Sequence, residues 1–399
     1  MRHRGEEPGF PYYGQNLKVK ITRHRPPSPF GCDYKTEYHR RDLEDDELWD
    51  LSLSDHVIKY PVVETAPLDD DSTAELIMEK PVRVGYWRCA AQVIVCTVVP
   101  QCGQPYRAVA KIFDPLYRQS VSDSGRHPPF DITRDADEDY SLEASAYETL
   151  DRAGLTGNLV PMYHGSWTFT LDIPCNGSQY QRSIRLILIE YLDGCTIADL
   201  ITMDGVDGVP FPGSDALDEK YRLDVMVQIV DAETRLVHNG VIHRDLAPRN
   251  VVLVPDPRTT TMNWERLSPP SRVVIIDFAC AEICSLTKYT RSKRVPTTYV
   301  HPARHRHTSA DTYANQPSNQ AIDPSSTSSL TELPCNPVDP MLRGWGPSID
   351  DFSFWLPVAL RDSGDPMNRK ARPCYQWLVK EFGKDSGRAH LYKPMRELP

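Results

Sequence analysis

The chain lacks the marks of a secreted, disulfide-stabilised or membrane-spanning protein. Its ten cysteines form no CxxC pair, and the closest two, Cys280 and Cys284, have no histidine pair at zinc-finger spacing beside them. No uncharged apolar run approaches the roughly 18 residues that a membrane helix needs. The opening MRHRGEEPGFPYYG has no apolar signal-peptide core. We therefore expect reduced thiols and an intracellular protein, cytoplasmic or nuclear.

The chain also has no surplus of basic residues. It carries 45 Lys and Arg against 55 Asp and Glu, which gives a net charge of −10. Because phosphate backbones and anionic membranes attract positively charged surfaces, this balance predicts neither a nucleic-acid partner nor a membrane partner. The apolar share of 40% and the charged share of 25% are ordinary for a globular protein.

With 399 residues the chain is longer than one typical domain, and its composition changes along its length. Residues 1–75 mix proline, tyrosine and charge, and we expect an extended or partly disordered leader there. Residues 76–192 hold several β-branched runs and predict a mainly β lobe. Residues 193–399 favour helix and predict a second lobe, interrupted near 301–340 by a mobile insertion rich in Ser, Thr, Asn and Pro.

Local patterns predict the individual elements. The run at 82–99 and the run YRAVAKIF at 106–113 are separated by the turn-forming PQCGQP, which indicates a hairpin. DEDYSLEASAYETLDRAG has helical character and stops at Gly154. EKYRLDVMVQIVDAETRLVHNG places apolar residues on one helical face and stops at Gly240. ARPCYQWLVKEFG predicts a helix near the C-terminal end of the sequence.

The stretch VIHRDLAPRNVVLV, from Val241 to Val254, is unusual for a plain core element. It places a histidine, two arginines, an aspartate and an asparagine between two apolar runs. Burying such groups is costly unless they meet partners, so their position beside strand-like segments indicates a functional site.

Several motifs, in order, resemble those of the protein kinase family. HRDLAPRN is similar to the catalytic loop H-R-D-L-x-x-x-N, and VVIIDFA resembles the strand that leads into D-F-G. YRAVAKIF resembles the V-A-I-K strand, LEASAYETL resembles the helix that carries its partner acid, and SIDDFSFW resembles a central helix with Asp350 as its buried aspartate. The resemblance implies a divergent eukaryotic-type kinase with an α+β, bilobal fold. That fold has an N-terminal antiparallel β lobe with one αC-type helix and a mainly α C-terminal lobe, here abbreviated at its C-terminus.

The resemblance also implies a role for each matching residue. Lys111, held by Glu143, would bind the α and β phosphates of ATP. Asp277 and Asn250 would hold Mg²⁺, and Asp245 would accept or orient the hydroxyl proton of the acceptor. Further implied site residues are His243 and Arg244 beside Asp245, and nucleotide contacts at Gly85, Val93, Ala110, Glu190 and Leu192 together with Lys111.

The chain departs from the kinase pattern at several positions. The phosphate-covering G-x-G-x-x-G is missing, since Tyr86, Arg88 and Ala91 stand where glycines belong and only Gly85 can be matched. D-F-G is D-F-A, with Ala279 in the third position. No A-P-E follows, and the segment after the central helix is short.

Three functions therefore stay open. The first is an ATP- and Mg²⁺-dependent phosphotransferase whose acceptor is a protein Ser, Thr or Tyr. The second is a small-molecule kinase of the aminoglycoside and choline kinase-like branch. The third is a pseudokinase that binds or scaffolds without turnover, which the missing glycines and the D-F-A sequence favour. Glu148, on the same helix as Glu143, competes with it as the partner of Lys111.

Overall fold

The protein is described by a computed structural model, in which the chain divides into two units, Met1–Arg291 and Ser292–Pro399. All the expected site residues except Asp350, which lies outside the described residues, belong to the first unit. The described residues are 13–31, 33–49, 51–65, 73–85, 91–120, 129–201, 217–260, 272–288, 333–339, 352, 355–360 and 373–395.

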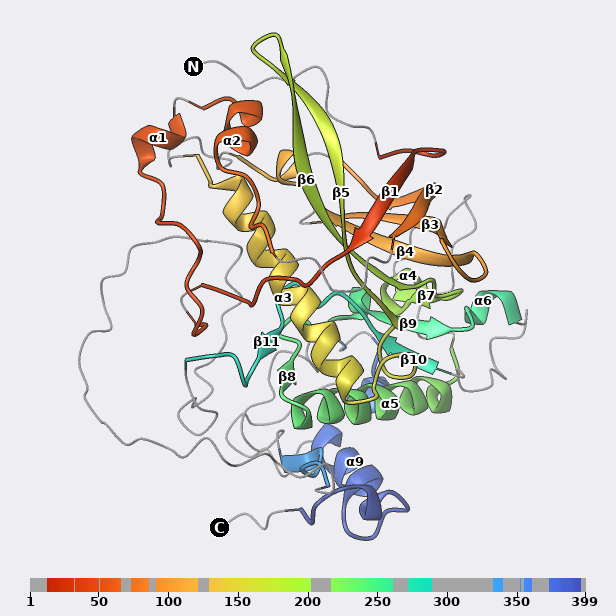
Figure 1. Ribbon diagram of the computed structural model, residues 1–399. Coiled ribbons are helices and arrows are strands. Elements are labelled where there is room, and N and C mark those ends of the chain that lie inside the picture. Colours follow the sequence, from red (N-terminus) through yellow and green to blue (C-terminus); the bar gives the residue numbers. More distant parts are fainter. Residues whose placement is uncertain are drawn as a thin grey trace, which may run out of the picture. The chain divides into compact units, whose positions relative to one another are not determined.

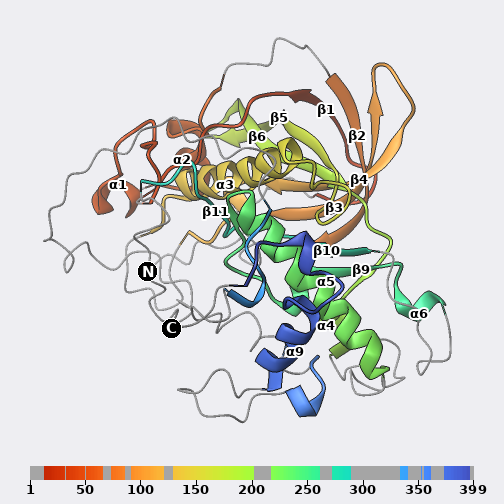
Figure 2. The same ribbon diagram turned by 90° about the horizontal axis from the view of Figure 1, so that it is seen from below.

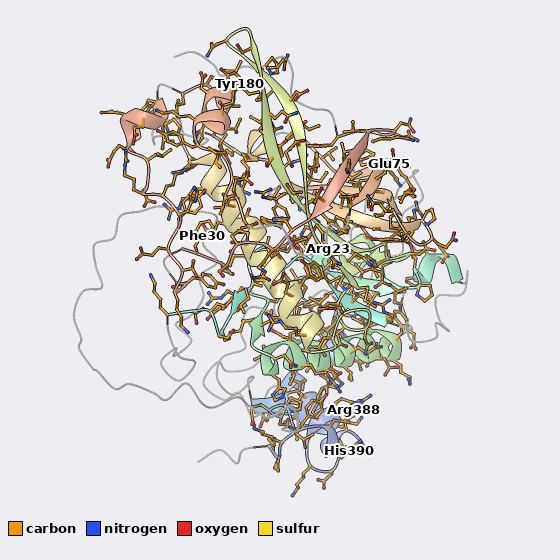
Figure 3. The ribbon with its side chains drawn as sticks, viewed as in Figure 1. Arg23, Phe30, Glu75, Tyr180, Arg388 and His390 are labelled. Atoms are coloured by element: carbon orange, nitrogen blue, oxygen red, sulfur yellow. The ribbon has the colours of Figure 1, made fainter. Side chains whose placement is uncertain are left out.

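A closed antiparallel barrel forms a large part of the first unit (Figure 1). Its strand order is β1-β2-β3-β4-β6-β5, and β1 closes the ring by pairing with β5 through Thr22 and Thr168. β5 and β6 form a long hairpin with Tyr180 near its tip (Figure 3). The strands are β1 (Lys18–Arg23), β2 (Thr73–Arg83), β3 (Gln92–Pro100), β4 (Tyr106–Phe113), β5 (Tyr163–Cys175) and β6 (Ser178–Glu190).

The alternation of side chains along each strand fills the barrel. Successive residues of a strand point to opposite faces, so every second residue enters the interior. Ile21, Leu76, Ile94, Ala110 and Leu188 are fully buried and belong to one apolar cluster inside the ring. The residues between them face outward. Because apolar side chains fill the interior, a polar site can form only on the outer face of the barrel.

One long helix, α3 (Ile132–Arg152), packs against the outside of the barrel (Figures 1 and 2). The carboxylate of Asp131 caps its first turn by accepting the Arg134 N–H at 3.1 Å. At the other end Gly154 has φ +69° and donates to Asp151 O, while Leu155 donates to Leu150 O. These bonds form a Schellman motif, so the predicted stop at Gly154 is confirmed.

The remaining elements of the first unit are shorter, apart from α5 (Glu219–His238), which Asp218 caps. Gly240 follows α5 with φ +81°, as the sequence predicts. Three strands form a small sheet of order β10-β9-β7, and two more pair as β11 and β8. The bounds are α1 (Asp45–Trp49), α2 (Leu53–Lys59), β7 (Cys195–Thr196), α4 (Ile197–Ile201), β8 (Val241–Ile242), β9 (Val251–Val254), α6 (Pro257–Thr260), β10 (Arg272–Ile275) and β11 (Glu282–Ile283).

In the second unit the predicted C-terminal helix is present as α9 (Pro373–Phe382). Its apolar face buries Cys374, Leu378 and Phe382. Residues 333–339 contact the C-terminal end of α9, because the side-chain amide of Asn336 donates to Phe382 O at 2.8 Å.

The expected kinase-like, bilobal fold class with a mainly α C-terminal lobe is wrong. The β part is a closed six-stranded barrel, and the described residues contain only seven α-helices. The strand that closes the barrel, KVKITR (Lys18–Arg23), lies in the segment expected to be a leader. It alternates polar and apolar residues and pairs with both β2 and β5. Beyond residue 193, the β-branched runs VVLV and RVVI pair as the short antiparallel strands β9 and β10, so this part of the chain is not mainly helical.

Part of the expected mobile insertion, residues 301–332 and 340, lies outside the described residues, as do Tyr86 and Arg88. Among the helices that the structure describes, none combines the length and the apolar character needed to cross a membrane.

We predict that Ile21→Ala lowers the free energy of unfolding by about 2–4 kcal/mol, since it removes a fully buried side chain from the barrel interior. The matched control is Lys20→Ala, whose side chain is exposed on the same strand and whose loss should cost less than about 0.5 kcal/mol. Urea denaturation of both variants measures the difference. Equal effects would show that Lys18–Arg23 is not a barrel strand.

Candidate functional site

The site begins on the outer face of the barrel, where β4 presents Lys111. In the sheet register Lys111 lies between Val93 of β3 and Ile187 of β6. Its neighbours Ala110 and Ile112 point into the barrel, so the lysine points away from it. Only 7% of Lys111 is exposed, which means that its charge requires partners within the protein.

Helix α3 supplies the first partner. Glu143 Oε1 lies 2.5 Å from Lys111 Nζ, and the Glu143 side chain is fully buried. The predicted pairing with Glu143 is therefore present in the structure. The competing acid on this helix, Glu148, is half-buried, and no ion pair joins it to Lys111. A buried lysine with a buried glutamate is costly to desolvate and depends on close geometry.

The second partner follows β10. Asp277 Oδ1 lies 2.8 Å from Lys111 Nζ, and the Asp277 side chain remains 33% exposed. The next residue, Phe278, donates its backbone N–H to Glu143 Oε1 at 3.2 Å. One carboxylate oxygen of α3 therefore binds both the lysine of β4 and the segment after β10. We call Lys111, Glu143 and Asp277 the ion triad.

The pKa values in the triad reflect burial and charge. The positive charge of Lys111 holds the pKa of Asp277 down at about 2, although burial acts in the opposite direction. Complete burial raises the pKa of Glu143 to about 7, and the attraction of Lys111 only partly offsets this. Burial also disfavours the charged form of Lys111, but the two carboxylates outweigh it and raise the lysine pKa. The partly exposed Asp277 is therefore the ionised acid of the triad.

The polar loop identified in the sequence lies between β8 and β9 and adjoins the triad. Asn250 O accepts the Ile276 N–H at 2.9 Å, which places Asn250 beside the residue that precedes Asp277. His243 Nε2 contacts Ile276 O at 2.9 Å, while Asp245 N–H donates to His243 Nδ1 at 3.2 Å. Because a carbonyl only accepts and an N–H only donates, Nε2 carries the hydrogen. Burial lowers the pKa of His243, which keeps the imidazole neutral.

Asp245 lies at the exposed side of this loop. Asn250 Nδ2 donates to Asp245 Oδ2 at 3.0 Å and to Asp245 O at 2.7 Å, which fixes the orientation of the loop. Arg249 forms an ion pair with Asp245 Oδ1. Arg249 is 58% exposed, so this pair is of the weak, solvent-screened kind.

Two residues of the site have strained backbones. Arg244 has φ +63° and Asp277 has φ +68°, both in the left-handed region that residues other than glycine rarely adopt. Elsewhere in the described residues the non-glycine positive φ values belong to Asn16 and Asn176, for which this conformation is less costly. Arg244 is tied down by an ion pair with Glu282. Such strain persists where surrounding contacts impose it, and it is frequent at functional sites.

The oxygen atoms near Asp277 suit a hard cation. Asp277 Oδ2 and Asn250 Oδ1 accept no hydrogen bond within the part of the chain that the structure describes, whereas their other polar atoms are engaged. Carboxylate and amide oxygens are the ligands that Mg²⁺ prefers, and Mg²⁺ is usually held by one or two carboxylates together with phosphate oxygens. No group of three His, Cys, Asp or Glu side chains forms a metal cage among the described residues. The donors thus fit an ion shared with a phosphate ligand.

The expected nucleotide contacts divide between two faces of the barrel. Val93 is partly exposed on the same face as Lys111. Ala110 lies in the closed interior instead, and the outward neighbour that shares the face of Lys111 is Val109, which is partly exposed. The sequence YRAVAKIF contains a signal that could have identified Val109: in a strand, residues two apart share a face, so Val109 lies on the same face as Lys111.

The other expected nucleotide contacts lie at strand ends. Gly85 donates its N–H to Gln92 Oε1 at 2.7 Å just after β2. Glu190 ends β6, and its carboxylate is bound by Arg272 at 2.7 Å and by the Met162 N–H at 3.0 Å. Leu192 follows β6 and is partly exposed.

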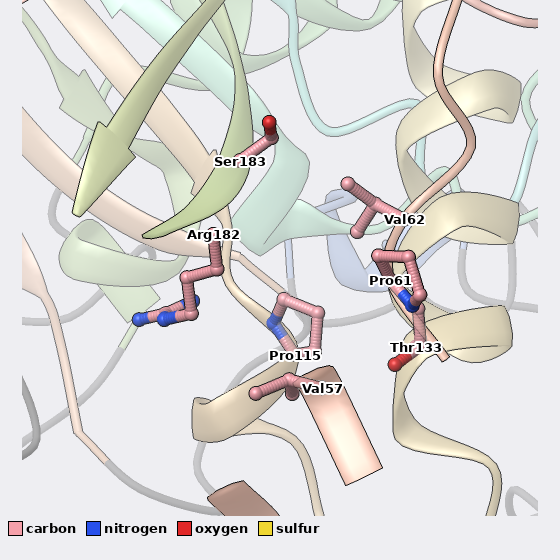
Figure 4. Close-up of a pocket in the computed structure, with 7 residues that line it drawn as sticks. All are labelled: Val57, Pro61, Val62, Pro115, Thr133, Arg182 and Ser183. Atoms are coloured by element: carbon pink, nitrogen blue, oxygen red, sulfur yellow. The ribbon is translucent and has the colours of Figure 1, made fainter. Parts of the chain in front are cut away.

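A cavity elsewhere in the first unit is too small for a nucleotide. It lies among α2, the residues that follow α2, the start of α3 and strand β6, and Val57, Pro61, Thr133 and Arg182 are among the residues that line it (Figure 4). Its water-accessible volume of about 10 Å³ suits a single water molecule. The cavity shares no residue with the ion triad.

No protein-family model matches the chain, and no curated protein is significantly similar to it.

We predict that Lys111→Met destabilises the protein by roughly 3 kcal/mol at pH 8.5 and by less at pH 5.5. The folded-state pKa of Glu143 is raised to about 7, above its unfolded value, and removing the lysine raises it further. The variant therefore loses stability relative to the native protein as pH rises, because an ionised Glu143 would then be unpaired.

Urea denaturation at both pH values measures this effect. Adding Glu143→Gln to Lys111→Met should remove most of the pH dependence. Lys220→Met, at an exposed ion pair on α5, is the matched control and should have little effect. A pH-independent loss in Lys111→Met would contradict the charge assignments in the triad.

Proposed function

We propose that this chain transfers the γ-phosphoryl group of ATP to a hydroxyl group and requires Mg²⁺ to do so. The observation that carries the proposal is the ion triad, a buried lysine held between a buried and a partly exposed carboxylate, directly beside the loop of Asp245 and Asn250. Phosphoryl transfer depends mainly on positioning and charge neutralisation, and the triad and the loop supply groups for both.

Lys111 is the proposed phosphate-binding residue. Glu143 holds the ammonium from the buried side, and Asp277 holds it from the exposed side. The three N–H bonds of the ammonium are not all used by these two contacts, so the lysine can also donate to phosphate oxygens. Val93 and Val109, partly exposed on the same face, offer an apolar surface to the base.

Asp277 and Asn250 are the proposed Mg²⁺ ligands. The two residues lie at the adjoining ends of β9 and β10, where the Ile276 N–H donates to Asn250 O. The low pKa of Asp277, about 2 because of Lys111, keeps its carboxylate ionised and able to bind a cation at neutral pH. A bound Mg²⁺ would supply neutralisation of the phosphate charge.

Asp245 is the proposed partner of the acceptor hydroxyl. Asn250 and the backbone contact to His243 fix its position, and its side chain remains 25% exposed. A carboxylate held in this way can accept a hydrogen bond from a hydroxyl and orient it toward the phosphate. The likeness of the H-R-D sequence to that of protein kinases supports a protein Ser, Thr or Tyr as the acceptor, and a small-molecule hydroxyl is the alternative.

A second candidate function is nucleotide binding without transfer. The observation that favours it is that both carboxylate oxygens of Asp245 are engaged, one by Arg249 and one by Asn250. In that case Arg249 would stay paired with Asp245 when a ligand binds, and it would block the position that an acceptor hydroxyl needs.

The proposed function is tested first by calorimetric titration of ATP with and without Mg²⁺, on the native protein and on Asp277→Asn. We expect Mg²⁺-dependent binding to the native protein, and a loss of at least about tenfold in the variant, since a ligand of the ion is removed. Absence of ATP binding at millimolar concentration would reject both candidate functions.

For turnover, we predict that Asp245→Asn reduces phosphoryl transfer by roughly 10²–10⁴-fold, the usual contribution of a positioned acid–base group. ATP affinity should change by no more than a few fold, because Asp245 is assigned to the acceptor and not to the nucleotide. Transfer to a mixture of protein acceptors, followed with γ-labelled ATP, measures the rate. The matched control is Asp224→Asn on α5, which should have native activity. Binding without transfer in the native protein would favour the second candidate.

A further inference from the structure

The connection between β1 and β2 is far longer than its geometry requires. β1 and β2 are antiparallel neighbours in the barrel, and such strands are ordinarily joined by two to five residues. Here β1 ends at Arg23 and β2 begins at Thr73. The described residues 24–31, 33–49 and 51–65 of this connection, which we call the strap, include α1 and α2 and lie along α3 (Figures 1 and 2).

The strap grips the first turn of α3. Arg40 Nη2 contacts both carboxylate oxygens of Asp131, at 2.8 and 2.6 Å, and His56 Nε2 lies 3.1 Å from Asp131 Oδ1. Asp131 is also the residue that caps the helix. Arg40 and His56 of the strap therefore both contact the residue that caps the N-terminus of α3.

The strap grips α3 again further along. Tyr38 Oη donates to Asp137 Oδ2 at 2.9 Å, and the Val63 N–H donates to the same oxygen at 2.8 Å. His24 Nε2 lies 2.6 Å from Tyr140 Oη. Phe30, which is buried and stacks on Tyr38, lies beside α3 in Figure 3. Tyr140 is three residues before Glu143, so the contact between His24 and Tyr140 lies within one helical turn of the ion triad.

The strap also holds the segment that follows Asp277. Tyr34 Oη donates to Ala281 O at 3.2 Å and accepts the Ile283 N–H at 3.4 Å. Around it, Lys35 N–H donates to Leu286 O and Lys288 N–H donates to Asp33 O, which makes an isolated β-bridge between Tyr34 and Thr287. Tyr34 is buried, so its hydroxyl bonds are protected from water.

These contacts converge on the triad from two sides. α3 carries Glu143, and the segment from Asp277 to Lys288 carries Asp277 and Phe278, which bonds Glu143 Oε1. β11 of that segment pairs with β8, which leads directly into His243. One strap therefore fixes both elements whose relative position sets the ion triad.

We propose that the strap positions the triad, and that Tyr38 and Tyr34 are positioning residues that hold Glu143 and the Asp277 segment in register. This inference rests on the proposed phosphoryl transfer for its kinetic test only. A merely structural role would lower stability, whereas a positioning role lowers kcat with little effect on ATP binding, because Lys111 and Asp277 remain present.

The test uses the full chain with the double variant Tyr34→Phe and Tyr38→Phe, which removes two hydroxyls and keeps both rings. The matched control is Tyr60→Phe, since the Tyr60 hydroxyl lies in the strap but donates to Glu47 within it. Hydrogen exchange of peptides covering 137–150 and 277–288 is measured together with kcat, KM for ATP and the thermal midpoint.

We expect faster exchange in both peptides of the double variant, and a kcat roughly ten- to a hundredfold lower, since a displacement of about 1 Å costs rates of that order. KM for ATP should stay within about twofold. Tyr60→Phe should behave as the native protein does.

Two results would overturn the inference: unchanged exchange in the double variant, or faster exchange with native kcat. If the native protein shows no turnover but exchange at α3 still rises in the double variant alone, the proposed function fails, the positioning role in catalysis fails with it, and the result shows only that the strap holds α3 in place.

Discussion

The buried charge of Lys111 constrains the whole first unit. A lysine that is 7% exposed requires neutralising partners, and these come from residues 32 and 166 positions away along the chain. β4, α3 and the end of β10 must therefore meet at one point outside the barrel. Removing Lys111 leaves the buried carboxylate of Glu143 without its partner, which costs far more than losing a surface ion pair. The triad thus acts as a structural constraint as well as a candidate site.

Barrel closure does not require the long connection between β1 and β2. Because β1 pairs with both β2 and β5, the sheet leaves no open edge on that side, and the connection from β1 to β2 has no structural need to be long. The chain instead crosses α3 and contacts the segment after Asp277 before it returns to the barrel. The strand before the strap, β1, and the strand after it, β2, both belong to the closed barrel. The barrel therefore anchors the strap on either side of its contacts with α3 and with the segment after Asp277.

Local motifs could be predicted from the sequence, and long-range closure could not. The helix stops at Gly154 and Gly240 follow from short patterns. The pairing of Lys111 with Glu143 is expected only because two short motifs resemble those of protein kinases. The strand at Lys18–Arg23 is only six residues within a proline- and charge-rich segment, and its partners are 51 to 146 positions away by the register, so no local signal indicates its pairing. Without that strand the barrel is not recognisable, and the predicted fold class failed for this reason.

The two strained residues link the fold to the proposed chemistry. Arg244 and Asp277 each adopt a left-handed conformation that costs of order 1–3 kcal/mol, and the side chain of each forms an ion pair, Arg244 with Glu282 and Asp277 with Lys111. Asp277 is held by Lys111 in front and by the Phe278 N–H bond to Glu143 behind. The left-handed turn aims its carboxylate at Lys111 while the following residue points back to α3. Asp277 thus makes its contact with Lys111 from a left-handed backbone, and strain of this kind persists where surrounding contacts impose it.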